Sequence, residues 1–189
     1  MKGLFDETIP LVGGHYAYTV VATVVVDDDE ARMKEALHVV TGDRKRGFHW
    51  ADEGPKARQR MISCLIELGA CAHVVVHHPT ARRGQERARA AAFEELLPAV
   101  LGDGADELVI ESRGAKLDAR DRAVVMGTLK DLGRTEVSYG WEGKSTPELW
   151  LPDAVCGAVG MYLDRSEPDW YMLLCEAQVI TEPKYIKGA

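Results

Sequence analysis

The chain has 189 residues, of which 46% are hydrophobic and 28% are charged. This composition predicts one globular domain over residues 1–189 and excludes a disordered or fibrous protein. The 30 acidic residues outnumber the 23 basic ones, for a formal net charge of −7. That balance argues against polyanion binding through the whole surface and leaves room for a local basic groove.

Residue patterns predict the secondary structure, because β-branched runs favour strands and apolar residues three or four apart favour helices. In chain order, we expect strands over 4–5 and 15–26, helices over 27–40 and 56–68, a strand over 70–76, a helix over 82–101, a strand over 107–110, a helix over 118–132, a strand over 135–141, helices over 147–163 and 170–177, and a polar tail. The alternation predicts an α/β domain with a central mixed or parallel sheet. Residues 164–189 are expected to form a C-terminal extension.

Two charged runs each have two interpretations. The four acids at 27–30 are typical of a helix start, and a metal-binding loop is the alternative. The basic tripeptide at 44–46 is typical of a solvated loop, and contact with a phosphate backbone is the alternative.

Several classes of protein lack support in the sequence. Neither G-x-x-x-x-G-K nor G-x-G-x-x-G is present, so the two common nucleotide-binding loops are missing. We expect no membrane helix and no signal peptide, because the apolar runs are short. The four cysteines show neither zinc-type nor redox pairing, so we expect reduced thiols in a cytoplasmic protein.

Three acids stand where a hydrophobic core would not place them. Asp6 and Glu111 each follow an apolar strand, and Asp153 lies near the start of the most apolar helix. Each has an ordinary explanation: Asp6 ends a strand, Glu111 pairs with Arg113, and Asp153 caps its helix. Together they favour a ligand site, because open α/β sheets bind ligands at the carboxyl ends of their strands.

Such a carboxylate cluster is what two-metal phosphoryl chemistry requires. Magnesium prefers hard oxygen ligands, and two ions about 4 Å apart clamp the attacking and leaving oxygens of an in-line displacement. The sequence therefore predicts a site for Mg²⁺ or Mn²⁺.

Three motifs then resemble a family of bacterial RNase H-like proteins of unknown function. They are Phe-Asp-Glu-Thr at 5–8, Val-Ile-Glu-Ser-Arg at 109–113 and Leu-Pro-Asp-Ala-Val-Cys-Gly-Ala at 151–158. The family usually opens with Asp-Glu-Ser-Gly, whereas this chain has Thr8-Ile9 in place of Ser-Gly and Pro152 where Ala is common. The resemblance implies an RNase H-like fold with helices on both faces of a central mixed sheet.

The resemblance also implies functional residues. It assigns Asp6, Glu111 and Asp153 as metal ligands and catalytic groups, with Glu7 as a further ligand. His49, near a position where the family often has His, would orient a phosphate or water, and packing beside Trp50 is the alternative. Arg113 would neutralise phosphate charge, unless it is only a partner of Glu111. Of His77 and His78, at most one can face the site, because neighbouring strand residues point to opposite faces.

The leading hypothesis is a metal-dependent nuclease or phosphodiester-processing protein with nucleic acid as partner. One rival is a catalytically silent RNase H-like module that binds a protein partner in a mobile-element or defence system, or forms a homo-oligomer. A second rival is an enzyme acting on a small phosphate ester. A basic groove leading to the carboxylates favours the nuclease.

Overall fold

The computed structural model describes residues 1–25, 30–42 and 47–188 of the chain. Seven strands form one sheet in the order β6-β5-β1-β3-β4-β7, and the short β2 pairs with β3. The strands are β1 (Lys2–Thr8), β2 (Leu11–Val12), β3 (His15–Val25), β4 (Ala70–Thr80), β5 (Glu107–Glu111), β6 (Ser138–Glu142) and β7 (Lys184–Lys187). The helices are α1 (Glu30–Thr41), α2 (Pro55–Glu67), α3 (Gln85–Gly102), α4 (Ala115–Asp131), α5 (Trp150–Leu163) and α6 (Asp169–Glu176).

Strand β3 organises the sheet. It runs antiparallel to β1 on one side and to β4 on the other, whereas β1, β5 and β6 are parallel neighbours. Nearly every residue of β3 is buried, and its valines alternate between the two faces. This pattern suits a strand covered on both sides, where β-branched residues pack well.

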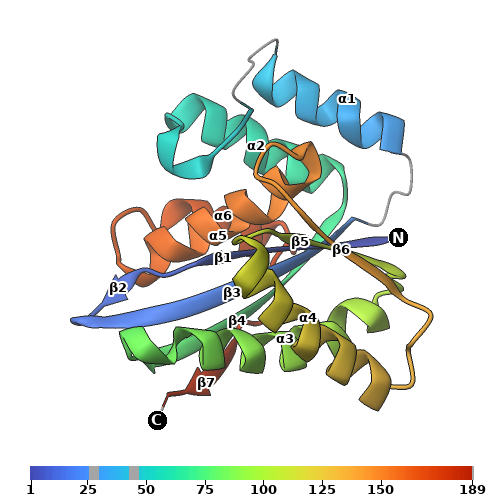
Figure 1. Ribbon diagram of the computed structural model, residues 1–189. Helices are drawn as coiled ribbons and strands as arrows, with labels where there is room; N and C mark the ends of the chain where they lie inside the picture. Colours follow the sequence, from blue (N-terminus) through green and yellow to red (C-terminus); the bar gives the residue numbers. More distant parts are fainter. Residues whose placement is uncertain (26–29, 43–46, 189) are drawn as a thin grey trace.

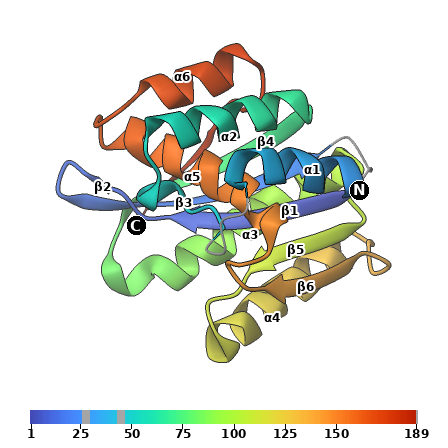
Figure 2. The same cartoon turned by 90° about the horizontal axis from the view of Figure 1, so that it is seen from above.

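Helices cover both faces of the sheet (Figures 1 and 2). Leu4 and Val21 pack in one core cluster, with residues of α1, α2, α5 and α6. Phe5 and Val20 pack in the second cluster, with residues of α3 and α4. Because side chains alternate along each strand, one sheet contributes residues to two separate cores, one on each face.

The predicted α/β fold with a central mixed sheet and helices on both faces is confirmed by this strand order and these directions. The predicted strands at 4–5, 15–26, 70–76 and 107–110 all lie in the one sheet. The predicted helix start at 27–29 and the basic tripeptide at 44–46 lie outside the described residues.

The C-terminal region differs from the polar tail that the sequence predicted. Residues 184–187 form β7, which extends the sheet in parallel beside β4. Leu174 of α6 and Val179 are buried in the core cluster that contains Leu4. The pairing of β7 with β4, which is distant in the sequence, determines this outcome, and the local composition of residues 184–187 does not predict a strand.

All four cysteines are free, with Cys64 and Cys156 buried and Cys71 and Cys175 half-buried. In the described part of the chain, no helix combines the length and apolar character that a membrane crossing requires.

Candidate metal centre

Asp6 and Glu111 lie side by side on neighbouring strands. Strands β1 and β5 are parallel with Phe5 opposite Ile110, so the next residues along the two strands are Asp6 and Glu111. Leu4 and Val109 pack under the α5 layer, and alternation turns both acids to the same face. Asp6 is inside β1, two residues before its end at Thr8, rather than beyond the strand as the sequence suggested.

Asp153 reaches the same place from the first turn of α5. Its carboxylate accepts a hydrogen bond of 2.7 Å from the backbone N–H of Trp50 and lies 3.1 Å from Nδ1 of His49. The helix-cap interpretation is wrong, because Leu149 occupies the N-cap position of α5. The His49 side chain is half-exposed and fixes one oxygen of Asp153.

Burial and neighbouring carboxylates raise the pKa of two acids of this centre, Asp6 and Asp153. Burial raises the pKa of Asp6 well above its ordinary value, and the charges of Glu111 and Asp153 raise it further. A hydrogen bond with Glu111 adds to this effect. Burial also raises the pKa of Asp153, against the opposing influence of the Trp50 N–H and His49. Acids held close in a buried place repel unless a proton or a cation separates them.

Lys144 is a residue of this centre that the sequence analysis missed. Its Nζ lies 3.2 Å from Glu111, and its side chain is 71% exposed. Burial works against its charge, yet Glu111, and then Asp6 and Asp153, raise the pKa of the Lys144 ammonium. A cation therefore already lies within the field of all three carboxylates.

A sequence signal for Lys144 does exist. It lies in the short connection between the predicted strand at 135–141 and the predicted helix at 147–163 that carries Asp153. A connection after a strand of an α/β sheet opens at the ligand-binding edge.

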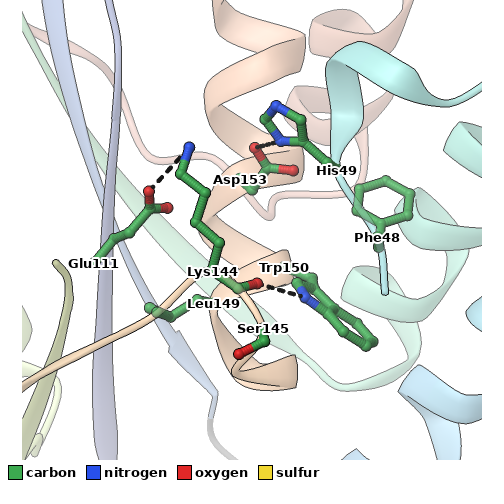
Figure 3. Close-up of a pocket in the computed structure, with 8 residues that line it drawn as sticks. All are labelled: Phe48, His49, Glu111, Lys144, Ser145, Leu149, Trp150 and Asp153. Carbon is green, nitrogen blue, oxygen red and sulfur yellow. Dashed lines mark hydrogen bonds and ion pairs between the residues drawn. The ribbon is translucent and has the colours of Figure 1, made fainter. Parts of the chain in front are cut away.

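A cavity of about 330 Å³ opens onto this cluster (Figure 3). It is lined by Phe48, His49, Glu111, Lys144, Ser145, Leu149, Trp150 and Asp153. Figure 3 shows the Lys144 side chain extended toward Glu111 and His49 turned toward Asp153. Asp6 is nearly inaccessible, so Glu111 and Asp153 present the exposed part of the centre.

Two predicted site residues belong to the opposite face of the sheet. The Glu7 carboxylate is paired with Arg89 and accepts a hydrogen bond from the Tyr18 hydroxyl. Arg113 pairs with Glu86 and Asp121, not with Glu111. The prediction of Glu7 as a ligand beside Asp6 is therefore wrong, because adjacent strand residues face opposite ways. The prediction that Arg113 faces the carboxylates is also wrong, because the chain leaves β5 after Glu111 and ion pairs with Glu86 and Asp121 hold Arg113 on the Glu7 side.

His77 and His78 also lie apart from the cluster. Nδ1 of His77 is 2.8 Å from the hydroxyl of Thr80, and Nε2 of His78 is 3.4 Å from the carbonyl of Val12. Both lie on β4, which β3 separates from β1.

The donor set fits a hard divalent cation. Asp6, Glu111 and Asp153 come from three elements and lie close enough for their charges to act on Asp6 and Asp153, although within the described residues their oxygens are not all within 4.8 Å of one another. The His49 ring and the Trp50 backbone N–H hold Asp153 beside the cavity. Oxygen ligands are those that Mg²⁺ and Mn²⁺ prefer. Asp6, Glu111 and Asp153 are thus the residues that could hold such an ion.

No protein-family model matches the sequence, and no curated protein matches it. Among solved structures, a similar chain occurs in the PCNA:RNase HII complex from Archaeoglobus fulgidus. It is 14% identical, the alignment covers 94% of this chain and 78% of that one, and the TM-score is 0.47. A similarity this weak carries no conclusion about function, and the fold assignment rests on the strand order given above.

Proposed function

We propose that this protein is a nuclease or phosphodiester-processing enzyme that uses Mg²⁺ or Mn²⁺ held by Asp6, Glu111 and Asp153. The proximity of these three carboxylates beside a cavity carries the proposal, and the pKa of Asp6, raised by burial and then by the charges of Glu111 and Asp153, supports it. Repulsion among the acids is relieved when a divalent cation binds them. When bound, the ion would supply positive charge that polarises a phosphoryl oxygen.

The chain's own residues would have distinct roles. Asp153 would be kept in its binding orientation by His49 and the Trp50 N–H. Such supporting hydrogen bonds orient ligands and raise metal affinity. Lys144 is largely exposed, so it would move from Glu111 to the phosphate once the ion neutralises the acids. His49, also exposed, would bind a phosphate oxygen at the mouth of the cavity.

The biological setting follows the sequence resemblance. We propose a cytoplasmic protein of the bacterial RNase H-like family of unknown function, with a nucleic acid as its substrate. Four free cysteines support the reducing location. Lys144 and His49 are cationic or ionisable groups at the cavity that would contact the phosphate backbone.

A catalytically silent RNase H-like binding module is the second candidate. Lys144 favours it, because an ammonium paired with Glu111 already supplies part of the charge that an ion would bring. In that case the centre would be a preserved structural feature, and the cavity would bind a partner without turnover.

The deciding experiment compares variants of two neighbouring acids, Asp6 and Glu7. The wild type, Asp6→Asn and Glu7→Gln are incubated in Mn²⁺ with labelled single-stranded, duplex and hybrid nucleic acids, and with a small phosphodiester. We expect wild-type cleavage, a loss of at least about 100-fold in Asp6→Asn and retained specific activity in the folded fraction of Glu7→Gln. Cleavage of the small phosphodiester alone would indicate an enzyme that acts on small phosphate esters.

Metal binding is measured separately from turnover. Binding of Mn²⁺ to the folded state alone stabilises it by about 2.7 kcal/mol at a hundredfold excess over the dissociation constant. The wild type should therefore melt several degrees higher in millimolar Mn²⁺ than in chelator, and Asp6→Asn should gain little. Binding without cleavage of any substrate supports the silent module. Equal Mn²⁺ responses in the two proteins would contradict both candidates.

A further inference from the structure

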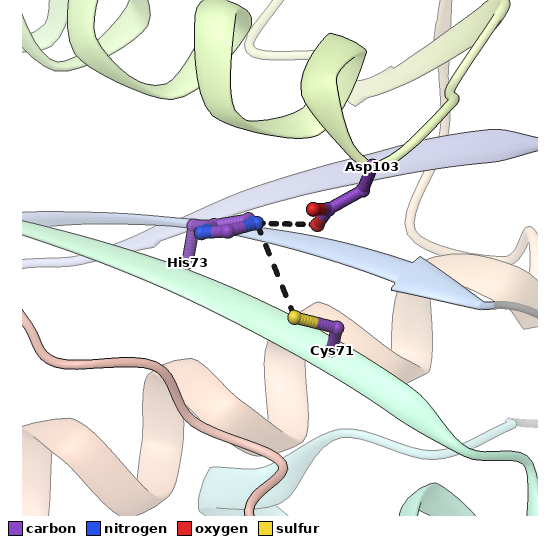
Figure 4. A group of neighbouring side chains, drawn as sticks. All are labelled: Cys71, His73 and Asp103. Atoms are coloured by element: carbon purple, nitrogen blue, oxygen red, sulfur yellow. Dashed lines mark hydrogen bonds and ion pairs between the residues drawn. The ribbon is translucent and has the colours of Figure 1, made fainter.

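A second group of ligand-type side chains lies on the opposite face of the sheet. Within residues 1–25, 30–42 and 47–188, one set of three His, Cys, Asp or Glu residues has its ligand atoms within 4.8 Å of one another: Cys71, His73 and Asp103 (Figure 4). Cys71 and His73 are two apart on β4 and share the face of Val75, which packs in the core beneath α3. Asp103 is the C-cap residue of α3.

The distances are close to those of a tetrahedral centre. Nε2 of His73 lies 4.0 Å from Cys71 Sγ and 2.6 Å from an Asp103 oxygen. Zinc bonds of about 2.3 Å to sulfur and about 2.0 Å to nitrogen and oxygen put the sulfur–nitrogen pair about 3.5 Å apart and the nitrogen–oxygen pair about 3.3 Å apart. Shifts of less than about 1 Å, within reach of side-chain rotation, give that arrangement.

The second ring nitrogen of His73 has the support that a metal ligand needs. Nδ1 lies 3.3 Å from the hydroxyl of Thr181, and this hydroxyl donates to the carbonyl of Ala72 at 3.2 Å. The hydroxyl therefore accepts from an Nδ1–H. That contact fixes the ring orientation and turns Nε2 toward Cys71 and Asp103, as the outer hydrogen bonds of metal-bound histidines do.

A nucleophilic cysteine is the competing interpretation, and the geometry argues against it. In a catalytic triad, the acid binds one ring nitrogen of the histidine and the nucleophile faces the other. Here both Asp103 and Cys71 face Nε2. In addition, burial and then the charge of Asp103 raise the pKa of the Cys71 thiol, so it is not activated.

We propose that Cys71, His73 and Asp103 bind Zn²⁺, with water as the fourth ligand. Thiolate and imidazole select zinc over Mg²⁺, which separates this centre from the all-carboxylate centre around Asp6. Binding requires the Cys71 thiolate and a free lone pair on Nε2 of His73, so the thiol proton and any proton on Nε2 leave to solvent when the ion binds.

The site is within reach of solvent, because the His73 and Asp103 side chains are 17% and 36% exposed. Its effect is structural. A bound ion would link the beginning of β4 to the end of α3, elements that are 30 residues apart at His73 and Asp103. A cross-link that closes such a loop stabilises the folded state, because binding occurs only after the three ligands have been brought together.

Cobalt provides the direct test, because Co²⁺ occupies zinc sites and a bound thiolate gives a sulfur-to-cobalt charge-transfer band. The full-length protein is titrated with Co²⁺ in excess Mg²⁺, which saturates the carboxylate centre. We expect the band in the wild type and its removal by Zn²⁺. Cys71→Ser should lack the band, and the matched control Cys175→Ser, at another half-buried free thiol, should keep it.

Thr181→Val tests the supporting hydrogen bond, and we expect affinity to fall by about 10–100-fold with the band retained. Zinc should also raise the melting temperature of the wild type and not that of Cys71→Ser. A wild type without a charge-transfer band, or a band that survives in Cys71→Ser, would overturn the proposal. Neither result depends on the Asp6 centre, because Asp6→Asn should keep the cobalt band.

Discussion

Asp6 and Glu7 are neighbours on β1, yet their carboxylates face opposite electrostatic environments. Asp6 faces two further acids, Glu111 and Asp153, with the partly exposed Lys144 at their edge. Glu7 faces Arg89, which is 2% exposed and also binds Asp121 at 3.0 Å. Burial lowers the pKa of Arg89 to about 10, although Asp121 acts against that change.

The comparison shows how one strand supplies both an acid paired with buried arginines and an acid that faces further acids. On the Glu7 face, Arg89 of α3 and Arg113 of the segment after β5 neutralise the acids. This network therefore requires no added proton or cation. On the Asp6 face, the acids outnumber the cations, and burial together with the charges of Glu111 and Asp153 raises the pKa of Asp6. An excess of buried acids calls for a proton or an added cation.

The largest effect should come from breaking the compensated network. Arg89→Met leaves Glu7 and Asp121 without their buried partner, and we expect a loss of about 3–5 kcal/mol in the free energy of unfolding. Urea denaturation at neutral pH measures it. The control is Arg120→Met, whose exposed contact with Glu86 at 4.0 Å is worth less than about 1 kcal/mol. Equal losses in the two variants would refute the contrast.

The two neighbouring acids should respond with opposite signs when each is made neutral. Glu7→Gln removes the charge that Arg89 and Tyr18 bind, and should cost about 2 kcal/mol. Asp6→Asn removes one of three repelling acids and should leave the metal-free protein as stable as the wild type or more stable. Denaturation of both in chelator at neutral pH measures this. A destabilised Asp6→Asn would argue against repulsion at that centre.

The dependence of stability on pH should distinguish the wild type from Asp6→Asn. The pKa of Asp6 is raised in the folded state above its ordinary value of 3.8. Its contribution is therefore fully present below that value and is lost as the pH rises through the folded pKa. The wild type in chelator should lose stability relative to Asp6→Asn as the pH rises above 3.8 and through the raised pKa of the folded state. Saturating Mn²⁺ should stabilise the wild type and oppose this loss, and a pH-independent difference in chelator would contradict the assignment.

The smallest effect should come from Lys144→Gln. Its ion pair with Glu111 is exposed, so the free energy of unfolding in chelator should change by less than about 1 kcal/mol. Because Lys144 competes for the same carboxylates, the variant should bind Mn²⁺ up to about fivefold more tightly, the equivalent of the same energy. Calorimetric titration measures the affinity. Weaker binding would mean that Lys144 assists the ion instead of competing with it.

The sequence predicted Asp6, Glu111 and Asp153 as candidate site residues, because an acid within or at the end of an apolar segment is energetically costly and therefore stands out. It also placed the strands that carry Asp6 and Glu111, since runs such as Leu-Val-Ile at 108–110 favour a buried strand on local grounds. Side chains alternate between the two faces along a strand, so the sequence alone could also have placed Glu7 and Asp6 on opposite faces of β1.

Only the tertiary structure decided which side chains meet across long sequence distances. The partners of Arg113 come from α3 and α4, and Lys144 reaches Glu111 through the connection between β6 and α5. Cys71, His73 and Asp103 come together because α3 ends over the beginning of β4. Local patterns fix helix and strand through short-range sterics and periodicity. The meeting of distant side chains depends on how those elements pack, because packing geometry is a property of the assembled layers.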